Sequence, residues 1–419
     1  MLKDIFKKLS RNKIFYIFLF LAIIMFPSTL YLQSDKDTTL IVTTIGIDKD
    51  TKSNEYEVTS LAVIPKGSND ISANLETFKA KGKTIAEALD SMSLNCGKKI
   101  GLAHCDSIIF SLEVIEENIA KTLDYFIRTS NLTTNATIIA TDDKASDLID
   151  ATKSSNNLFD LSLKNIINFS EDMSMLDNIT IDRFYRTYFG RNTTFFLPIL
   201  SIEEGVNPTG GESGGAGSEG NSGESSGGSD SSGESKKKIK NDQKILIIKD
   251  GLPLRTLTDD ETFIYNLISR KSSHIRIEIE NINDQYVTNS TESYQQVDKI
   301  IVPKYYFEDD KPVVEYSIWL SIMIDEISST DNHSYSSIDS LQNFLSPAAT
   351  EEIRKQINEK LEKTNNLMQE NGHDIIEAYE HFNAFHTKKW RQYLSIQDDP
   401  NNYLKDVTIK IKLNLNYVV

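Results

Sequence analysis

The first half of the chain alternates between segments whose apolar residues recur with a period of two and segments with helical spacing, the patterns of strands and helices. Strands are predicted over residues 40–47, 55–64, 105–115 and 135–141, and helices over residues 84–95 and 117–130. The first helix opens with Thr84 as its predicted N-cap and has Glu87 at the capping-box position. Residues 38–203 are therefore predicted to form an N-terminal α/β region.

Residues 244–271 predict a hairpin followed by a helix. An apolar strand leads through the turn residues Asp250 and Gly251 into a second strand, and the helix is predicted to be capped near Thr258. We expect this segment to pack with the N-terminal region.

Strict alternation dominates residues 272–419, which indicates strands with one apolar and one polar face. A long helix is predicted to cover the apolar face, with Ser346 as its N-cap and Pro347 at its first position. The prediction is an α+β domain in which an antiparallel sheet packs on a long helix. The helix has the apolar stripe Ile353, Ile357 and Leu361, and the strands have the apolar positions Ile275, Ile277 and Ile279, then Val314, Tyr316, Ile318, Leu320, Ile322 and Ile324, then Val407, Ile409, Ile411, Leu413, Leu415 and Tyr417.

Gly, Ser and Glu dominate residues 204–243, which contribute almost no apolar side chain to a core. This composition predicts a flexible linker or surface loop. Residues 211–215 also match the G-x-S-x-G expression with Ser213 at the centre. A nucleophile elbow requires a strand before it and a helix after it. Neither is predicted here, so Ser213 is not interpreted as catalytic.

The longest uncharged run extends from Ile14 to Ser34. A membrane-spanning helix needs roughly 20 apolar residues, so residues 14–34 are predicted to form an uncleaved transmembrane anchor. Residues 1–13 are rich in Lys and Arg, which predicts a cytoplasmic basic tail and places the bulk of the chain on the outer side. A cleaved secretory signal is the alternative, although the run is long for one and no A-x-A-like site follows it.

Length and charge narrow the class of protein. The 419 residues fit two or three domains. The 45 Lys and Arg against 61 Asp and Glu give a formal net charge of −16, which argues against nucleic acid as a partner because phosphate binding needs clustered cations. Cys96 and Cys105 form no CxxC metal pair. Two unpaired thiols are predicted, with a single bridge as the alternative.

The acidic loop that begins at Asp48 and Asp50 does not match a calcium-binding loop. Lys52 occupies the fifth position of the loop, where an EF-hand needs an oxygen ligand, and Thr59 occupies the twelfth. The loop is therefore interpreted as a hairpin tip.

Other candidate residues are isolated as well. His381 and His386 are five residues apart and miss the i, i+4 spacing of two zinc ligands on one helical face. Residues 82–84 read Gly-Lys-Thr like the end of a P-loop, but Thr77 stands where the first Gly is required. His104, beside Cys105, is interpreted as a structural residue. No catalytic, cofactor-binding or metal-binding residue is predicted.

Four segments, in matching order, resemble the Ger(x)C family, the C subunits of nutrient germinant receptors in endospore-forming bacteria. Residues 46–48 and 56–59 resemble the family's Gly-Ile-Asp strand and, after an acidic turn, its Tyr-Glu-Val-Thr strand. The other three segments are residues 82–111 with a Gly-Lys-Thr helix start, residues 247–262 with a Lys-Asp-Gly hairpin, and residues 384–393 before the last strand. The resemblance covers residues 38 to 419.

This resemblance implies a three-domain α+β protein without known enzymatic activity or cofactor, on the outer side of the spore inner membrane. It also implies that the chain acts with a multi-pass A-type subunit and a transporter-like B-type subunit in nutrient-triggered germination. Family members are typically lipoproteins with a lipobox cysteine, whereas the first cysteine here is Cys96. A spanning helix at residues 14–34 would replace the lipid anchor.

Two other functions stay open as alternatives. A membrane-anchored cell-surface hydrolase or carbohydrate-binding protein would need convergent acid, base or nucleophile groups, and only isolated candidates occur. A structural envelope protein would share the scaffold without the adjacent genes for A-type and B-type subunits.

Overall fold

The computed structural model describes residues 39–65, 73–129, 131–154, 163–172, 175–190, 193–204, 237–268, 275–282, 285–290, 299–329 and 338–417, together with Tyr16, Phe20 and Leu21. The basic tail, most of the predicted anchor at residues 14–34 and Ser213 lie outside the described residues. None of the helices in the described part of the chain has the length and apolar character needed to cross a membrane.

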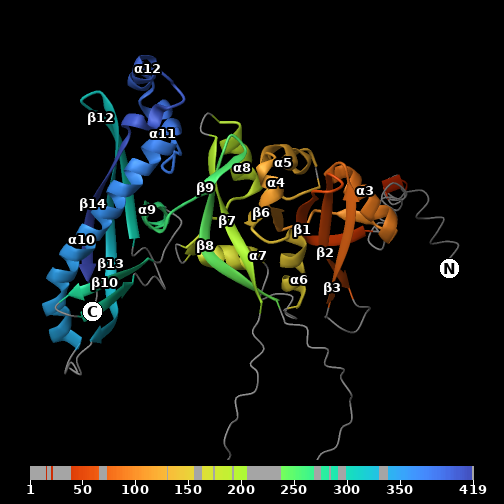
Figure 1. The fold of residues 1–419 in the computed structure, drawn as a ribbon, viewed down its shortest axis with the longest axis horizontal. Coiled ribbons are helices and arrows are strands. Elements are labelled where there is room, and N and C mark those ends of the chain that lie inside the picture. Colours follow the sequence, from red (N-terminus) through yellow and green to blue (C-terminus); the bar gives the residue numbers. More distant parts are fainter. Residues whose placement is uncertain are drawn as a thin grey trace, which may run out of the picture.

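A nine-stranded sheet with helices on both faces forms the N-terminal body, on the right in Figure 1. The strand order is β3-β2-β1-β5-β6-β7-β8-β9, and β4 pairs with the first residues of β1. The central strands β1, β5, β6 and β7 are parallel, and the pairs toward both edges are antiparallel. The strands are β1 (Thr39–Asp50), β2 (Glu55–Pro65), β3 (Ala73–Gly82), β4 (Lys99–Gly101), β5 (Ser107–Ser111), β6 (Thr137–Thr141), β7 (Thr194–Glu204), β8 (Lys237–Lys249) and β9 (Leu252–Thr256).

Two layers of helices bury the two faces of this sheet. One apolar cluster joins side chains of α3, α4, α5 and α8 to the strands, and a second joins α6 and α7 to the opposite face. Helices on both faces are what a parallel sheet requires. The helices are α3 (Ile85–Cys96), α4 (Leu112–Glu116), α5 (Ile119–Arg128), α6 (Ala145–Ser154), α7 (Leu163–Asp172) and α8 (Ile181–Tyr188).

Most strands and helices predicted before residue 142 are confirmed, with one correction. The strand predicted over residues 105–115 ends at Ser111, because Leu112–Glu116 form α4. A short apolar run fits a buried strand and a buried helix equally well, and Val114 and Ile115 are buried in α4. The strand β3 and the helices α6, α7 and α8 were not predicted.

The Gly/Ser-rich segment joins two neighbouring strands of the same sheet. Strands β7 and β8 are antiparallel, and Glu204 at the end of β7 pairs with Lys237 at the start of β8. The first residues of β8 therefore fall within the range 204–243 assigned to the linker by composition. Opposite charges pair across the two strands there, with Glu203 facing Lys238, an arrangement that stabilises a sheet.

The predicted turn at Asp250 and Gly251 connects β8 to β9. Both residues have a positive φ, 54° and 81°. A Cβ on Gly251 would lie 2.3 Å from the Asn118 side-chain oxygen, which caps α5 by accepting a hydrogen bond from Ala120 N at 3.0 Å. Glycine is required both by the backbone angle and by this close approach.

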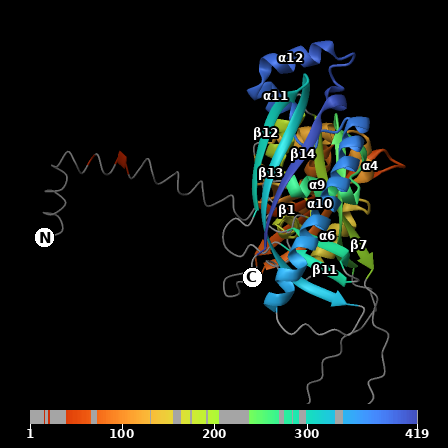
Figure 2. The ribbon, with the colours of Figure 1, turned by 90° about the vertical axis from the view of Figure 1, so that its left-hand side faces the viewer.

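A second sheet and a long helix form the C-terminal body, on the left in Figure 1. The strand order is β10-β11-β13-β12, with β14 beside β13. Figures 1 and 2 both show α11 and α12 at one end of this sheet. The elements are β10 (Arg276–Ile282), β11 (Gln285–Ser290), β12 (Lys299–Glu308), β13 (Lys311–Ser329), α10 (Ile338–Asn371), α11 (Ala378–Phe385), α12 (Thr387–Ile396), the 3-10 helix η1 (Tyr403–Asp406) and β14 (Thr408–Tyr417).

The prediction of an antiparallel C-terminal sheet is wrong in one respect, since β14 runs parallel to β13. Helices α10, α11, α12 and η1 lie between the two strands in sequence, and a helical crossover of this kind joins parallel strands. The pattern of alternation alone cannot distinguish the two directions.

The long helix α10 begins earlier than predicted. It starts at Ile338, so Pro347 lies inside the helix and Ser346 is not its N-cap. Residues 338, 341 and 344 are apolar at helical spacing, which supports a helix before the proline. The predicted stripe is confirmed, because Ile353, Ile357 and Leu361 are buried.

Candidate functional site

Asp48 caps a helix. Its two carboxylate oxygens accept hydrogen bonds from Ala145 N at 2.7 Å and Ser146 N at 2.9 Å, at the start of α6. Burial raises the pKa of Asp48, while these hydrogen bonds oppose the rise. Asp50 lies in the hairpin turn, where it accepts hydrogen bonds from Lys52 N and from the Lys81 side chain at 2.7 Å. Protein donors therefore already occupy both carboxylates.

The two cysteines are unpaired, and two of the histidines pack against aromatic rings. Cys96 and Cys105 are free thiols, and burial raises the pKa of Cys105 to about 12. His381 stacks on Tyr305 with ring centroids 4.4 Å apart, and His386 lies edge-on to Phe307. Across the described ranges, no group of three or more His, Cys, Asp or Glu is placed to hold a metal ion.

Thr84 has the capping role that its spacing predicts. Its hydroxyl accepts a hydrogen bond from Glu87 N at 3.1 Å, and the Glu87 carboxylate accepts one from Lys83 N at 2.8 Å. The Gly-Lys-Thr segment therefore forms a helix start.

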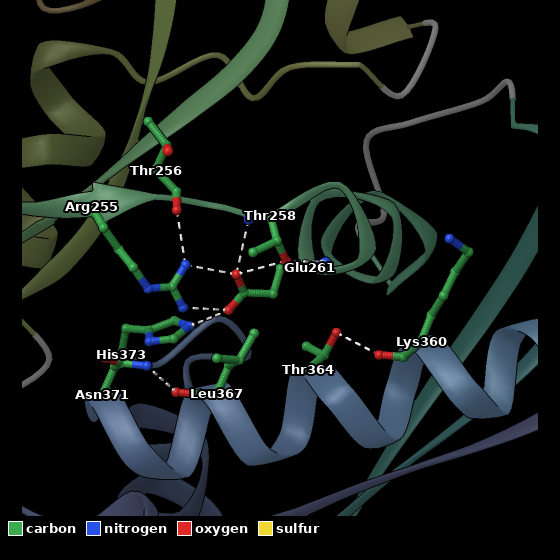
Figure 3. A network of polar contacts seen from close by, with 9 residues as sticks. All are labelled: Arg255, Thr256, Thr258, Glu261, Lys360, Thr364, Leu367, Asn371 and His373. Atoms are coloured by element: carbon green, nitrogen blue, oxygen red, sulfur yellow. Dashed lines mark hydrogen bonds and ion pairs between the residues drawn. The ribbon is translucent and has the colours of Figure 1, made fainter.

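A fully buried carboxylate, Glu261, lies where the two bodies meet (Figure 3). It belongs to the first turn of α9 (Asp259–Ile268), and α9 packs on α10. Thr258 precedes the helix, accepts a hydrogen bond from Glu261 N and donates its own N–H to Glu261 at 2.9 Å. This reciprocal capping box explains why α9 begins here.

Glu261 also binds one cation and one imidazole from opposite sides of the contact. Arg255, in β9 of the N-terminal body, donates two parallel hydrogen bonds of 2.7 Å. His373, after the end of α10 in the C-terminal body, places Nε2 at 2.9 Å. Burial raises the pKa of Glu261, but hydrogen bonds from Arg255, His373 and Thr258 outweigh burial and hold the pKa well below its usual range. Glu261 is therefore ionised and links the two bodies.

Further polar contacts surround this link. Asp260, next to Glu261, accepts hydrogen bonds from Lys360 at 2.5 Å and Lys363 at 2.8 Å on α10. Lys249 of β8 donates to the Gly372 carbonyl at 2.9 Å. These contacts hold α9, α10 and β8 in one arrangement.

The loop after α10 is itself fixed by a second buried carboxylate. Asp374 accepts hydrogen bonds from the backbone N–H groups of Ala378 and Tyr379 at 2.9 and 3.2 Å, at the start of α11. The Tyr403 hydroxyl donates to it at 2.7 Å. Burial raises the pKa of Asp374, and these hydrogen bonds oppose the rise. His373 therefore extends from a loop that is rigid on its C-terminal side.

Two cavities flank this loop between the bodies, with volumes of about 360 and 820 Å³. In the smaller one, Arg183 of α8 faces Glu377 of the loop, with a nitrogen–oxygen distance of 4.0 Å. Arg183 is paired with Asp177 at 2.6 Å, and Tyr265 of α9 donates to the same carboxylate. The lining of the smaller cavity is mixed aromatic and polar.

The site, defined as Arg255, Glu261 and His373 with their capping residue Thr258, is suited to joining two bodies rather than to bond making. Sequence reasoning found the cap near Thr258 but missed the rest. Glu261 and His373 are 112 residues apart, so no local spacing connects them. The signal that was present is the carboxylate in the third position after Thr258, typical of a capping box.

Comparison with known proteins places the chain in a family of spore germination proteins. Residues 33–202 match the family described as "Spore germination protein N-terminal domain". Residues 243–417 match the family described as "Spore germination B3/GerAC like, C-terminal". No curated protein matches the chain. A solved structure described as the crystal structure of the GerBC protein is 15% identical, with a TM-score of 0.49, over 90% of this chain and 99% of that one.

Proposed function

Because the chain belongs to the Ger(x)C family of spore germination proteins, we propose that it is the C-type subunit of a nutrient germinant receptor. It acts with A-type and B-type membrane subunits to trigger germination. The observation that carries this proposal is the order of the two family matches along the chain, with most of the Gly/Ser-rich segment between them.

The chain serves this role without catalysis. In support of this, Asp48, Thr84 and Cys105, each a candidate in the sequence, have structural partners or are buried. The hydrogen bonds of Glu261 with Arg255 and His373 support a structural role for the chain, because they fix how the two bodies are presented to a partner.

We also propose that residues 14–34 anchor the chain in the spore inner membrane, with the two bodies on the outer side. The uncharged run and the basic residues before it support this topology.

Isolation of the chain from spore membranes tests the partnership. An affinity tag at the C-terminus, mild detergent and mass spectrometry of the recovered proteins are expected to identify one A-type and one B-type subunit. The control is a strain in which the same tag is attached to an unrelated single-pass membrane protein. Recovery of neither subunit, with the tagged chain itself recovered, would contradict the proposal.

A further inference from the structure

The first residue of the folded region lies beside the end of a helix. Strand β1 begins at Thr39, which pairs with Lys99 in the parallel strand β4. Helix α3 ends at Cys96, and Gly97, with a φ of 65°, turns the chain into β4. Leu94, Lys98 and Lys99 therefore surround the point at which the chain enters the N-terminal body.

The length of chain before Thr39 limits how far this point can lie from a membrane. Four residues separate Ser34, the last residue of the proposed anchor, from Thr39. A fully extended chain spans at most about 3.6 Å per residue, so five steps reach about 18 Å. Neighbouring strands are about 4.8 Å apart, which keeps Lys99 close to the same limit. Thr39 therefore lies within about 18 Å of the end of the proposed anchor.

The side chains at this end suit a lipid surface. Leu94 is 83% exposed, Lys99 is exposed and Lys98 is partly exposed. The connecting residues 35–38 read Asp-Lys-Asp-Thr, with a net charge of −1, so any attraction to anionic headgroups has to come from the folded region. An apolar side chain flanked by cations is typical of contacts at the membrane interface.

We propose that the C-terminal end of α3 and strand β4, with Leu94, Lys98 and Lys99, rest on an anionic lipid surface. This contact depends on the anchor in the proposed function. It fixes the tilt of the molecule, since α3 lies at the end opposite the C-terminal sheet (Figure 1). The C-terminal body is then held away from the bilayer.

The lysines also follow a helix C-terminus, where cations stabilise the helix dipole, and a single exposed Leu is common on soluble surfaces. The test therefore has to measure proximity to lipid and not only stability. The full chain carrying Cys96→Ser and Asn95→Cys, at an exposed position beside Leu94, is labelled with a fluorophore and inserted into nanodiscs that contain a spin-labelled lipid quencher. Cys105 is fully buried. The comparison label is at Phe385→Cys, which is 75% exposed in the C-terminal body.

We expect strong quenching at position 95 in phosphatidylglycerol nanodiscs, less in phosphatidylcholine nanodiscs and little at position 385. The double variant Lys98→Glu/Lys99→Glu should reduce the fraction of chains that rest on the lipid surface. The reduction should be at least about fivefold for each lysine that is replaced. The matched double variant Lys388→Glu/Lys389→Glu on α12 should leave it unchanged.

Two results would overturn the inference alone while leaving the anchor and the receptor role intact. They are equal or stronger quenching at position 385, and quenching at neither position in a chain that resists alkaline extraction. Extraction of the chain by alkali would instead show that the anchor is wrong, and both proposals about the membrane would fall with it. Association with A-type and B-type subunits is scored separately.

Discussion

The two sheets differ in how many of their faces are buried. In the N-terminal body, every residue of β5 and β6 is buried, because the two layers of helices cover both faces. In the C-terminal body, β13 buries Ile318 but leaves the next residue, Trp319, 43% exposed. One face of that sheet packs on α10, and the opposite face has Ile300 and Val302 exposed as well.

This difference shows where sequence patterns are informative. Alternation identifies a half-buried strand and assigns its two faces, as it did for β13 over residues 317–320 and for β14. A strand buried on both faces shows only a short apolar run, which has no face to assign. We therefore expect β5 and β6 to be intolerant of change at consecutive positions. In β13 we expect intolerance at alternate positions over residues 317–320, where Ile318 and Leu320 are buried and Trp319 is exposed, whereas residues 312–316 are all buried.

Alanine substitutions at neighbouring positions test this directly and should have the largest effects. Ile108→Ala and Ile109→Ala in β5 should each lower the free energy of unfolding by about 3 kcal/mol, because both side chains are fully buried. Ile318→Ala should cost about as much, whereas Trp319→Ala should cost about 1 kcal/mol or less. Urea unfolding in mild detergent, followed by circular dichroism, measures all four. A difference above about 2 kcal/mol between the two β5 variants would contradict the expectation that both faces of β5 contribute equally to stability.

Substitution of Glu261, which links the two bodies, should have the next largest effect on the free energy of unfolding. Glu261→Gln leaves Arg255 and His373 without their carboxylate, and it should lower the free energy of unfolding by about 2 to 3 kcal/mol. The matched control is Glu351→Gln, whose partner Arg354 is exposed, and it should cost less than about 0.5 kcal/mol. Equal stability of the two variants in urea would show that the buried link is not needed to hold the bodies together.

The difference in stability between the wild type and Glu261→Gln is expected to depend on pH. The pKa of Glu261 is lower in the folded chain than its ordinary value of 4.5. Its contribution is therefore complete above the unfolded pKa and is lost as the pH falls through the folded pKa. The wild-type advantage over Glu261→Gln should shrink as the pH is lowered below about 5. The titration of Asp374 affects the stability of both proteins equally, so it cancels in the difference between them. A wild-type advantage that grows toward low pH would contradict the lowered pKa assigned to Glu261.

Removal of the Gly/Ser-rich segment should have the smallest effect. Replacing residues 205–236 with Asn-Gly joins Glu204 to Lys237 by a two-residue turn, which suits the observed antiparallel register. Shortening this loop should raise the free energy of unfolding by up to about 2 kcal/mol, since loop closure costs less. Urea unfolding of the shortened chain gives the value. A clear loss of stability would mean that the segment contributes to the N-terminal body.

The sequence predicted elements better than it predicted connections. The hairpin of β1 and β2, the caps at Thr84 and Thr258 and the stripe on α10 follow from local spacing, and the structure confirms them. The parallel direction of β14 and the long-range partners of Asp48 and Glu261 depend on contacts about 100 residues apart. Asp48 shows this most clearly, because it was interpreted as part of a hairpin tip, whereas it lies in β1 and its backbone partners lie in α6.

Germination of a deletion strain tests the central claim most directly. Spores that lack the gene, spores complemented with the wild-type chain and parental spores are exposed to a panel of nutrients, and the loss of optical density is followed over time. We expect the deletion to form normal numbers of dormant spores, to lose its response to at least one nutrient and to regain it on complementation. Normal germination on every nutrient, in a strain with no second gene of this family, would contradict the assignment as a receptor subunit.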